Sequence, residues 1–167
     1  LIFDGTTPFI NHFNETGSGL TALLPTVTVN QTLTLNGVNS FDRQFVFGPS
    51  AVISGIGGIT LRSGVFATNA PNAYSGPTLI TGGLWGASNS GSFGTTTSVT
   101  VQDGGGLQLF GTGTMNVNRP LFLSGSGDGT TTTYALAASS GAGNINGGTK
   151  GWAGAITLLG DSTMRSF

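Results

Sequence analysis

The strongest constraint on the fold is the way short apolar runs alternate with glycine-rich corners. Residues 72–86, with the sequence NAYSGPTLITGGLWG, contain two short apolar segments and two glycine turns. The same design recurs along the chain: a brief alternating run, a Gly, Asn or Ser corner, and another brief run. Such self-similarity is typical of solenoids, because each coil is one repeated unit that stacks on its neighbours. We therefore expect a solenoid of β-coils.

Period-two alternation of apolar and polar residues predicts β-strands throughout. Helix signals are nearly missing, because glycines interrupt the windows that show helical apolar spacing. The alternating runs are short and rich in Thr, Val and Ile, which suit a pleated sheet. The predicted strands are 27–29, 33–35, 44–47, 51–53, 59–61, 78–80, 98–101, 107–109, 121–123 and 155–158. Glycine at the corners between them adopts positive φ without a steric penalty.

The spacing of these strands separates a solenoid from other all-β folds. Leu79, Val99 and Leu121 recur at the period of one solenoid coil, roughly 20–23 residues. Sandwich strands are usually about 5 or 6 residues long and joined by hairpins, and transmembrane barrel strands have about 9 to 11 residues. In a coil, each strand pairs with the strands one turn above and below it, at about 4.8 Å. The sequence thus predicts an all-β fold of the β-solenoid type.

Alternation also predicts which side chains point into the coils, with the intervening Thr and Gln facing water. The expected core positions are Val27, Val29, Leu33, Leu35, Val99, Val101, Leu107, Leu109, Leu121, Leu123, Ile156 and Leu158. We expect residues 26–167 to form the solenoid repeat region. Residues 1–25 are the least regular part and are predicted to be an irregular N-terminal lead-in or cap. The run of four threonines at 130–133 is expected to form a long corner or loop.

Composition excludes several functional classes. Charged residues make up 7% of the 167 residues, where about 25% is usual, and the net charge is −1. The five basic residues are scattered, which argues against nucleic acid and against an anionic membrane surface as partners. The absence of cysteine excludes disulfides, thiolate metal sites and thiol catalysis. We see neither a signal peptide nor an apolar run long enough for a membrane span, and interpret the chain as a processed protein or a segment of a longer one.

Three segments share a glycine-rich pattern with a known bacterial repeat. They are 52–59 (VISGIGGI), 72–85 (NAYSGPTLITGGLW) and 151–163 (GWAGAITLLGDST). Together they resemble the autotransporter-associated β-strand repeat (passenger-type) family of secreted and surface bacterial proteins, from Val27 to the end of the chain. Pro77 departs from the family pattern, which usually has a second glycine there, and no closing β-barrel follows Phe167. The resemblance implies a right-handed parallel β-helix at an extracellular or bacterial cell-surface location.

The carboxylates are the first candidates for catalysis. They are Asp4, Glu15, Asp42, Asp103, Asp128 and Asp161. A glycosidase needs two carboxylates that converge across a sugar. Asp103, Asp128 and Asp161 each stand beside Gly or Ser, where Asp hydrogen-bonds its own turn, so we predict turn residues. The sequence therefore predicts no catalytic residue.

Other candidate sites are equally weak. His12 is the only histidine, so no Ser-His-Asp set can be argued. Residues 126–129 (SGDG) echo calcium-binding solenoid repeats, but those act as many stacked copies, and a calcium cage needs about six or more oxygen ligands. The glycosylation triplets at 14–16 and 30–32 are expected by chance in a Thr-rich chain. We predict neither a metal site nor a cofactor site.

Aromatic residues raise the question of sugar binding. Tyr74, Trp85, Trp152 and the phenylalanines would contact carbohydrate if they were exposed. In a repeat motif, however, such residues more commonly fill corners or cap the core. We therefore expect them to be structural.

The function predicted from these observations is structural. We expect a non-enzymatic extracellular protein: a β-helical stalk, an adhesin segment or a self-assembling fibre subunit on the bacterial surface. Because a solenoid exposes unpaired strand edges at its ends, the expected partners are further repeats or other copies, joined end to end. A surface glycan or host receptor is a second kind of partner, whereas nucleic acid and membrane insertion are not expected. The alternatives are a polysaccharide-binding or polysaccharide-degrading β-helix module, and a β-barrel or sandwich with an unrelated ligand.

Overall fold

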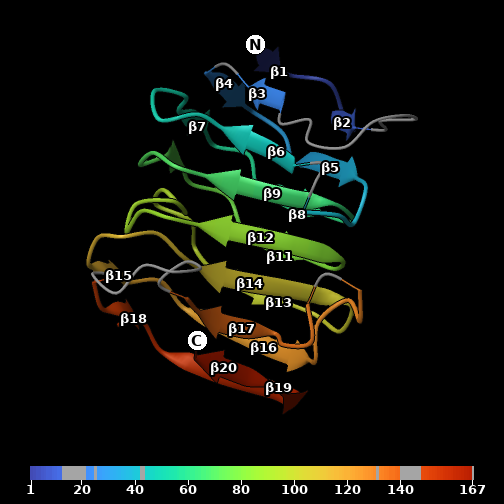
Figure 1. The fold of residues 1–167 in the computed structure, drawn as a ribbon. Coiled ribbons are helices and arrows are strands. Elements are labelled where there is room, and N and C mark those ends of the chain that lie inside the picture. The colour runs from blue at the N-terminus through green and yellow to red at the C-terminus, as the bar shows by residue number, and fades with distance from the viewer. Residues whose placement is uncertain (13–21, 25, 42–43, 131, 140–147, 167) are drawn as a thin grey trace.

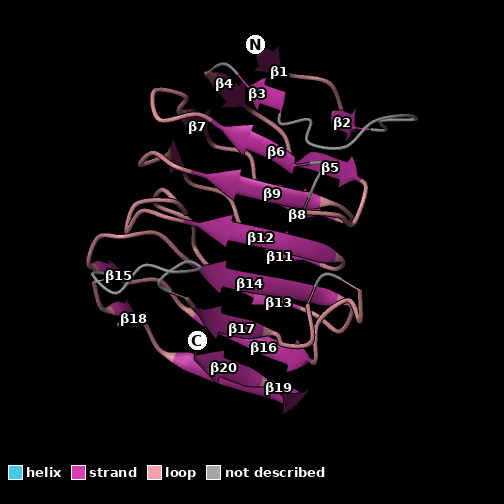
Figure 2. Ribbon diagram, in the orientation of Figure 1, coloured by secondary structure: helices cyan, strands magenta, loops and turns pink. Residues whose placement is uncertain are grey.

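The chain folds into an all-β parallel solenoid, as the sequence predicts. The computed structural model describes residues 1–12, 22–24, 26–41, 44–130, 132–139 and 148–166. Figures 1 and 2 show strands stacked in layers from the N-terminal to the C-terminal end, and every strand pair among these residues is parallel. The described ranges contain no helix that could span a membrane.

Two seven-stranded sheets form most of the solenoid. The first sheet contains β2 (Phe9–His12), β5 (Leu33–Gly37), β8 (Ile59–Leu61), β11 (Thr78–Ile80), β13 (Val99–Val101), β16 (Leu121–Gly125) and β19 (Ile156–Ser162). The second sheet contains β3 (Ala22–Leu24), β6 (Gln44–Phe47), β9 (Val65–Thr68), β12 (Gly83–Ala87), β14 (Gly105–Leu109), β17 (Leu136–Ala138) and β20 (Met164–Ser166). In both sheets, spatial neighbours are strands of successive coils.

Two smaller sheets complete the coils. Four strands pair in the order β1 (Ile2–Phe3), β4 (Val27–Val29), β7 (Ile53–Gly55) and β10 (Ala73–Tyr74). Further along the chain, β15 (Met115–Val117) pairs with β18 (Lys150–Trp152). Each coil therefore contributes only short strands, which is why the sequence shows many short alternating runs.

The length of a coil varies along the chain. Hydrogen bonds between side chains and neighbouring coils join residues 25 or 26 positions apart near the N-terminus, 20 apart in the middle, and 32 or 33 apart near the C-terminus. The predicted period thus describes the middle coils and is too short for the two ends. The additional residues lie in the corners, because strand register is continuous except for a shift between Leu123 and Gly125, where β16 pairs with β19.

The inward-facing side chains of the sheets form one hydrophobic core. Ten of the twelve predicted core residues, from Val27 to Leu123, are buried. The prediction is wrong for Ile156 and Leu158, which are 42% and 55% exposed. Both residues continue the inward columns, pairing with Leu121 and Leu123, but β19 belongs to the last coil and no further coil covers it.

The described part of residues 1–25, predicted as a lead-in or cap, contains three short strands. Strands β1, β2 and β3 pair with β4, β5 and β6, so they extend three sheets by one coil. Phe3 and Ile10 are half-buried and pack against the core. Residues 13–21 and 25 of this segment lie outside the described part of the chain.

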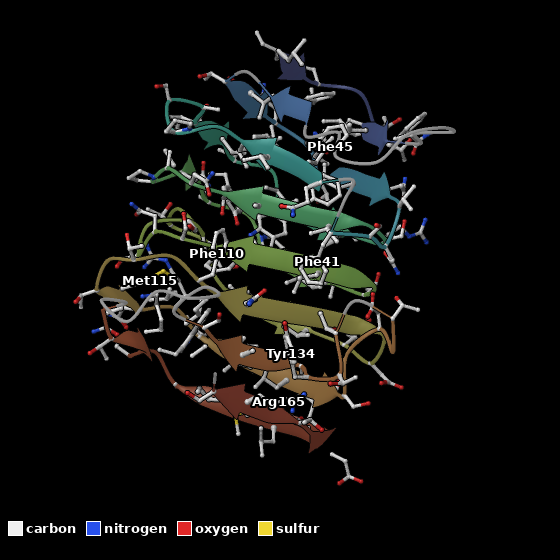
Figure 3. The ribbon with its side chains drawn as sticks, in the orientation of Figure 1. Phe41, Phe45, Phe110, Met115, Tyr134 and Arg165 are labelled. Carbon is white, nitrogen blue, oxygen red and sulfur yellow. The ribbon has the colours of Figure 1, made fainter. Side chains whose placement is uncertain are left out.

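The second sheet is covered on both of its faces in the middle coils. Phe66 and Trp85 point into the main core, whereas their neighbours Val65 and Leu84 belong to a separate apolar cluster on the other face. Tyr134 and Ala137 complete this outer cluster, and Figure 3 places Tyr134 over β17. Every residue of β9 and β12 is consequently buried, and neither strand shows the alternation by which strands are predicted.

Candidate functional site

One polar hollow lies at a corner between the first and second sheets. It has a volume of about 490 Å³ and is lined by Asp103, Ser124, Gly125, Ser126, Asp161, Ser162 and Thr163. Three successive coils contribute these residues: the turn after β13, the end of β16, and the end of β19 with the residue that follows it. The register shift between β16 and β19 adds residues to β19 and so forms this part of the corner.

The structure thus brings together two carboxylates that the sequence predicts only as separate turn residues. Asp103 and Asp161 are both exposed, and hydroxyl-bearing Ser and Thr side chains surround them. Carboxylates and hydroxyls are groups that can accept and donate hydrogen bonds to a polar ligand such as a sugar. The lining contains no His, Lys or Arg, and no cluster of three or more His, Cys, Asp or Glu side chains occurs among the described residues.

The remaining acidic and basic candidates are dispersed. The Asp128 carboxylate accepts hydrogen bonds from Thr130 N at 3.0 Å and Thr132 N at 2.7 Å, which confirms the predicted turn role. The Asp4 carboxylate accepts a hydrogen bond from the Asn30 side chain. The backbone of His12 belongs to β2; the side chain of His12, together with Glu15 and Asp42, lies outside the described part of the chain.

Tyr74 and the two tryptophans are structural, as expected, whereas Phe9 and Phe41 are 61% and 50% exposed. Tyr74 and Trp85 are fully buried. Trp152 is half-buried, and its indole Nε1 donates a hydrogen bond to the Arg119 carbonyl at 2.7 Å. Phe93 lies between the two tryptophans, with ring centroids 5.9 Å from Trp85 and 5.7 Å from Trp152. These aromatic rings pack successive coils against each other.

The residues of the 72–86 segment hold neighbouring coils together. The Asn72 side chain accepts a hydrogen bond from Ile53 N at 2.9 Å and donates one to the Ser92 carbonyl at 2.6 Å, so it bridges the coils on either side. The buried hydroxyls of Tyr74 and Thr78 are hydrogen-bonded at 2.6 Å. Burial raises the pKa of Tyr74 far above its ordinary value, since a phenolate inside the core would lose its hydration.

Glycine in the same segment permits close approach of the coils. A Cβ on Gly76 would overlap the backbone of Gly57 in the neighbouring coil. A Cβ on Gly83 would overlap the backbone of Gly64, and Gly83 also has a positive φ of 74°. The motif that carries the family resemblance therefore has a packing function at Asn72, Tyr74, Gly76 and Gly83.

The uncovered last coil is the second candidate site. Ile156 and Leu158 of β19 and Met164 of β20 are exposed apolar residues. Strands β19 and β20 each pair on one side only, because they are the last members of the two seven-stranded sheets. An exposed strand edge beside apolar side chains is a typical template for pairing with another strand.

These features define the class of the protein: a parallel β-solenoid whose motif residues act in coil-to-coil packing. No protein-family model, curated protein or solved structure matches the chain. What the protein does must therefore be inferred from the two sites and from the fold itself.

Proposed function

We propose that this chain is a non-enzymatic structural segment, a β-solenoid stalk or fibre element that extends and displays other parts of a protein at the bacterial surface. The main support is that the polar and aromatic side chains of the 72–86 segment hold the fold together. Hydrogen bonds inside or between coils engage the side chains of Asn72, Tyr74 and Thr78. The Trp85 side chain is buried in the core. A catalytic protein is expected instead to direct such groups into a cleft.

The surface composition supports an extracellular location. The chain has few charged residues, is rich in Ser, Thr and Asn, and has no cysteine. Its outward positions therefore carry mainly hydroxyls and amides. Because it has no cysteine, the protein does not need a reducing compartment. An extracellular location also agrees with the resemblance to the autotransporter-associated repeat family, which implies a secreted or surface protein.

The proposal is tested by shape and by location. Small-angle scattering and negative-stain microscopy of the purified chain are expected to show a rod whose axial rise follows the strand spacing of about 4.8 Å per coil. Antibodies against the chain are expected to label intact producing cells or their medium. Turnover of a glycan panel, detected by new reducing ends or by ultraviolet absorbance, would contradict the non-enzymatic function.

A second candidate function is glycan binding in the polar hollow. Its support is the convergence of Asp103 and Asp161 with three serines and a threonine. Replacing both aspartates by asparagine is expected to weaken glycan binding at least tenfold, because a carboxylate forms stronger hydrogen bonds to sugar hydroxyls than an amide does. Asp4→Asn, at the opposite end of the solenoid, is the matched control. Equal binding by the double variant and the control would exclude this function.

A further inference from the structure

The outer face of the second sheet carries no charge in the middle coils. Strand alternation assigns the outward positions: Gly86, for example, lies between Trp85 and Ala87, which both point into the core. From β6 to β17 the outward positions of the sheet hold only Gln, Val, Ala, Leu and Gly. This face therefore offers amides and apolar groups to a ligand, and no ionic partner.

The first aromatic ring on this face belongs to Phe110, which directly follows β14. A Cβ on Gly86 would lie 2.8 Å from the Phe110 ring, so the glycine allows the ring to lie against the sheet. The Phe110 side chain remains half-buried, as does that of Gln108, the outward residue before it. Phe110 and Gln108 thus place an aromatic ring beside an amide at the surface.

The second aromatic ring belongs to Phe41, in the connection between β5 and β6. The Phe41 carbonyl accepts a hydrogen bond from the Gln44 side chain at 2.8 Å, which places a second amide beside a ring. Figure 3 shows the side chains of Phe41 and Phe110 near β12, on the face where Tyr134 also lies. Phe41 is nevertheless 50% exposed. Core packing does not explain a large apolar ring that is half in water, whereas a binding surface does.

The chemistry of the face indicates an uncharged polysaccharide as the ligand. A sugar has C–H groups on the faces of its ring and hydroxyls at its edge, so it can stack on an aromatic ring and bond to neighbouring amides. An acidic glycan or a nucleic acid would find no cation at the outward positions between β6 and β17.

The area of exposed apolar surface argues against a protein partner on this face. A stable protein interface covers about 800 Å² on each partner. The apolar floor of the face is already buried, because Val65 and Leu84 are 4% and 1% exposed and lie in one cluster with Tyr134. Phe41 and the accessible part of Phe110 remain for contact. Two separate rings suit a narrow sugar chain better than a protein surface.

We propose that the outer face of the second sheet binds an uncharged polysaccharide, with sugar rings stacked on Phe41 and Phe110 and sugar hydroxyls hydrogen-bonded to Gln44 and Gln108. This binding function goes beyond the stalk function, which needs no ligand. The four residues belong to the coils of β6 and β14, inside the stack. None of them lines the polar hollow, so the two candidate glycan sites are separate.

Affinity electrophoresis of the 167-residue chain tests the proposal, in native gels that each contain one soluble polysaccharide. The uncharged probes are hydroxyethyl cellulose, xyloglucan, galactomannan and dextran, and the acidic probes are alginate and polygalacturonate. At least one uncharged probe is expected to retard the chain, and neither acidic probe is. Phe41→Ala is expected to weaken binding to the retarding probe by about tenfold or more, because it removes a stacking ring. Phe41→Trp is expected to keep binding, since it restores an aromatic surface.

Phe9→Ala is the matched control. Phe9 is 61% exposed, but it pairs with Thr34 and lies on the outer face of the first sheet, so its removal is expected to leave binding unchanged. The double variant Asp103→Asn with Asp161→Asn is also expected to bind like the unmodified chain, because the hollow is a different site. Circular dichroism of all variants reports whether the β-structure is retained.

Four outcomes overturn the proposal. They are the absence of retardation by every uncharged probe, equal binding by Phe41→Ala and Phe9→Ala, retardation by an acidic probe that is as strong as that by an uncharged one, and loss of binding in the double aspartate variant alone. The last outcome would assign the glycan to the polar hollow. Self-association of the unmodified chain that Phe41→Ala abolishes would also overturn it, and would identify a second copy as the occupant of the face.

Discussion

The middle coils and the last coil place the same kind of residue in different surroundings. Leu123 of β16 is fully buried, whereas Leu158 of β19, its partner in the next coil of the same column, is 55% exposed. Both are leucines that alternate with Thr or Phe in short strands. The difference shows that burial in this fold comes from the coil stacked above, and not from the strand pattern alone.

The largest expected effect comes from a matched pair of leucine-to-alanine substitutions, one in a middle coil and one in the last coil. Leu123→Ala is expected to lower the free energy of unfolding by about 2 to 5 kcal/mol, because it leaves a cavity in a packed column. Leu158→Ala is expected to cost about 1 kcal/mol or less, since much of its side chain is already in water. Chemical denaturation at low protein concentration measures both values. Similar losses at the two positions would contradict the view that stacking determines burial.

A glycine pair tests the contact between coils without changing the apolar core. Gly76→Ala is expected to destabilise the protein by about 1 to 3 kcal/mol, because the new methyl group overlaps the Gly57 backbone and forces two middle coils apart. Gly113→Ala is the control, since a Cβ there meets no atom within 4 Å and the φ of Gly113 is not positive. Thermal unfolding should separate the two variants clearly. Equal melting temperatures would show that the coils can shift to admit a side chain.

The buried hydroxyl pair offers a smaller perturbation. Tyr74→Phe is expected to cost about 1 to 2 kcal/mol, because it leaves the Thr78 hydroxyl buried without its partner. Tyr74→Phe combined with Thr78→Val is expected to recover most of this loss, since no polar group then remains unpaired at this place. Chemical denaturation of the two single variants and the double variant completes the cycle. Additive losses would show that the hydrogen bond does not couple the two residues.

The smallest effect is a dependence of stability on alkaline pH. The folded-state pKa of Tyr74 lies above its ordinary value near 10, so the unfolded chain loses this proton first. The stabilising contribution is complete below pH 10 and is lost as the pH rises above it, by about 1 kcal/mol between pH 10 and pH 11. Burial and the charge of Asp128 also raise the pKa of Tyr134, which acts in the same direction. Tyr74→Phe should flatten this decline, and a profile identical to that of the unmodified chain would contradict the assignment.

Sequence reasoning predicted the first sheet well and the second sheet poorly, for a physical reason. Strands such as β8 and β13 have one face in the core and one turned outward, so their residues alternate. In β9 and β12, the outer face is covered too, and the alternation disappears. The exposed strand β20 was missed for the opposite reason, because no face of it is buried.

The polar hollow shows another limit of sequence reasoning. Asp103 and Asp161 are far apart in the chain, and only the stacking of coils together with the register shift after Leu123 brings them to one corner. The strand spacing in the sequence predicts coil length only for the middle coils, whose corners are short. Additional corner residues elsewhere lengthen the coil and leave the strands unchanged. The exposure of Ile156 and Leu158 depends on the end of the stack, which alternation does not encode.

The varying length of the corners has a practical consequence. Since strand register is preserved while connecting segments differ in length, new peptide can be grafted into a corner without disturbing the ladder on either side. Residues 5–7 are exposed, and a Cβ on Gly5 would meet no atom within 4 Å. An epitope or enzyme tag inserted there would be carried outward on a rigid scaffold, at a height set by the number of coils beneath it.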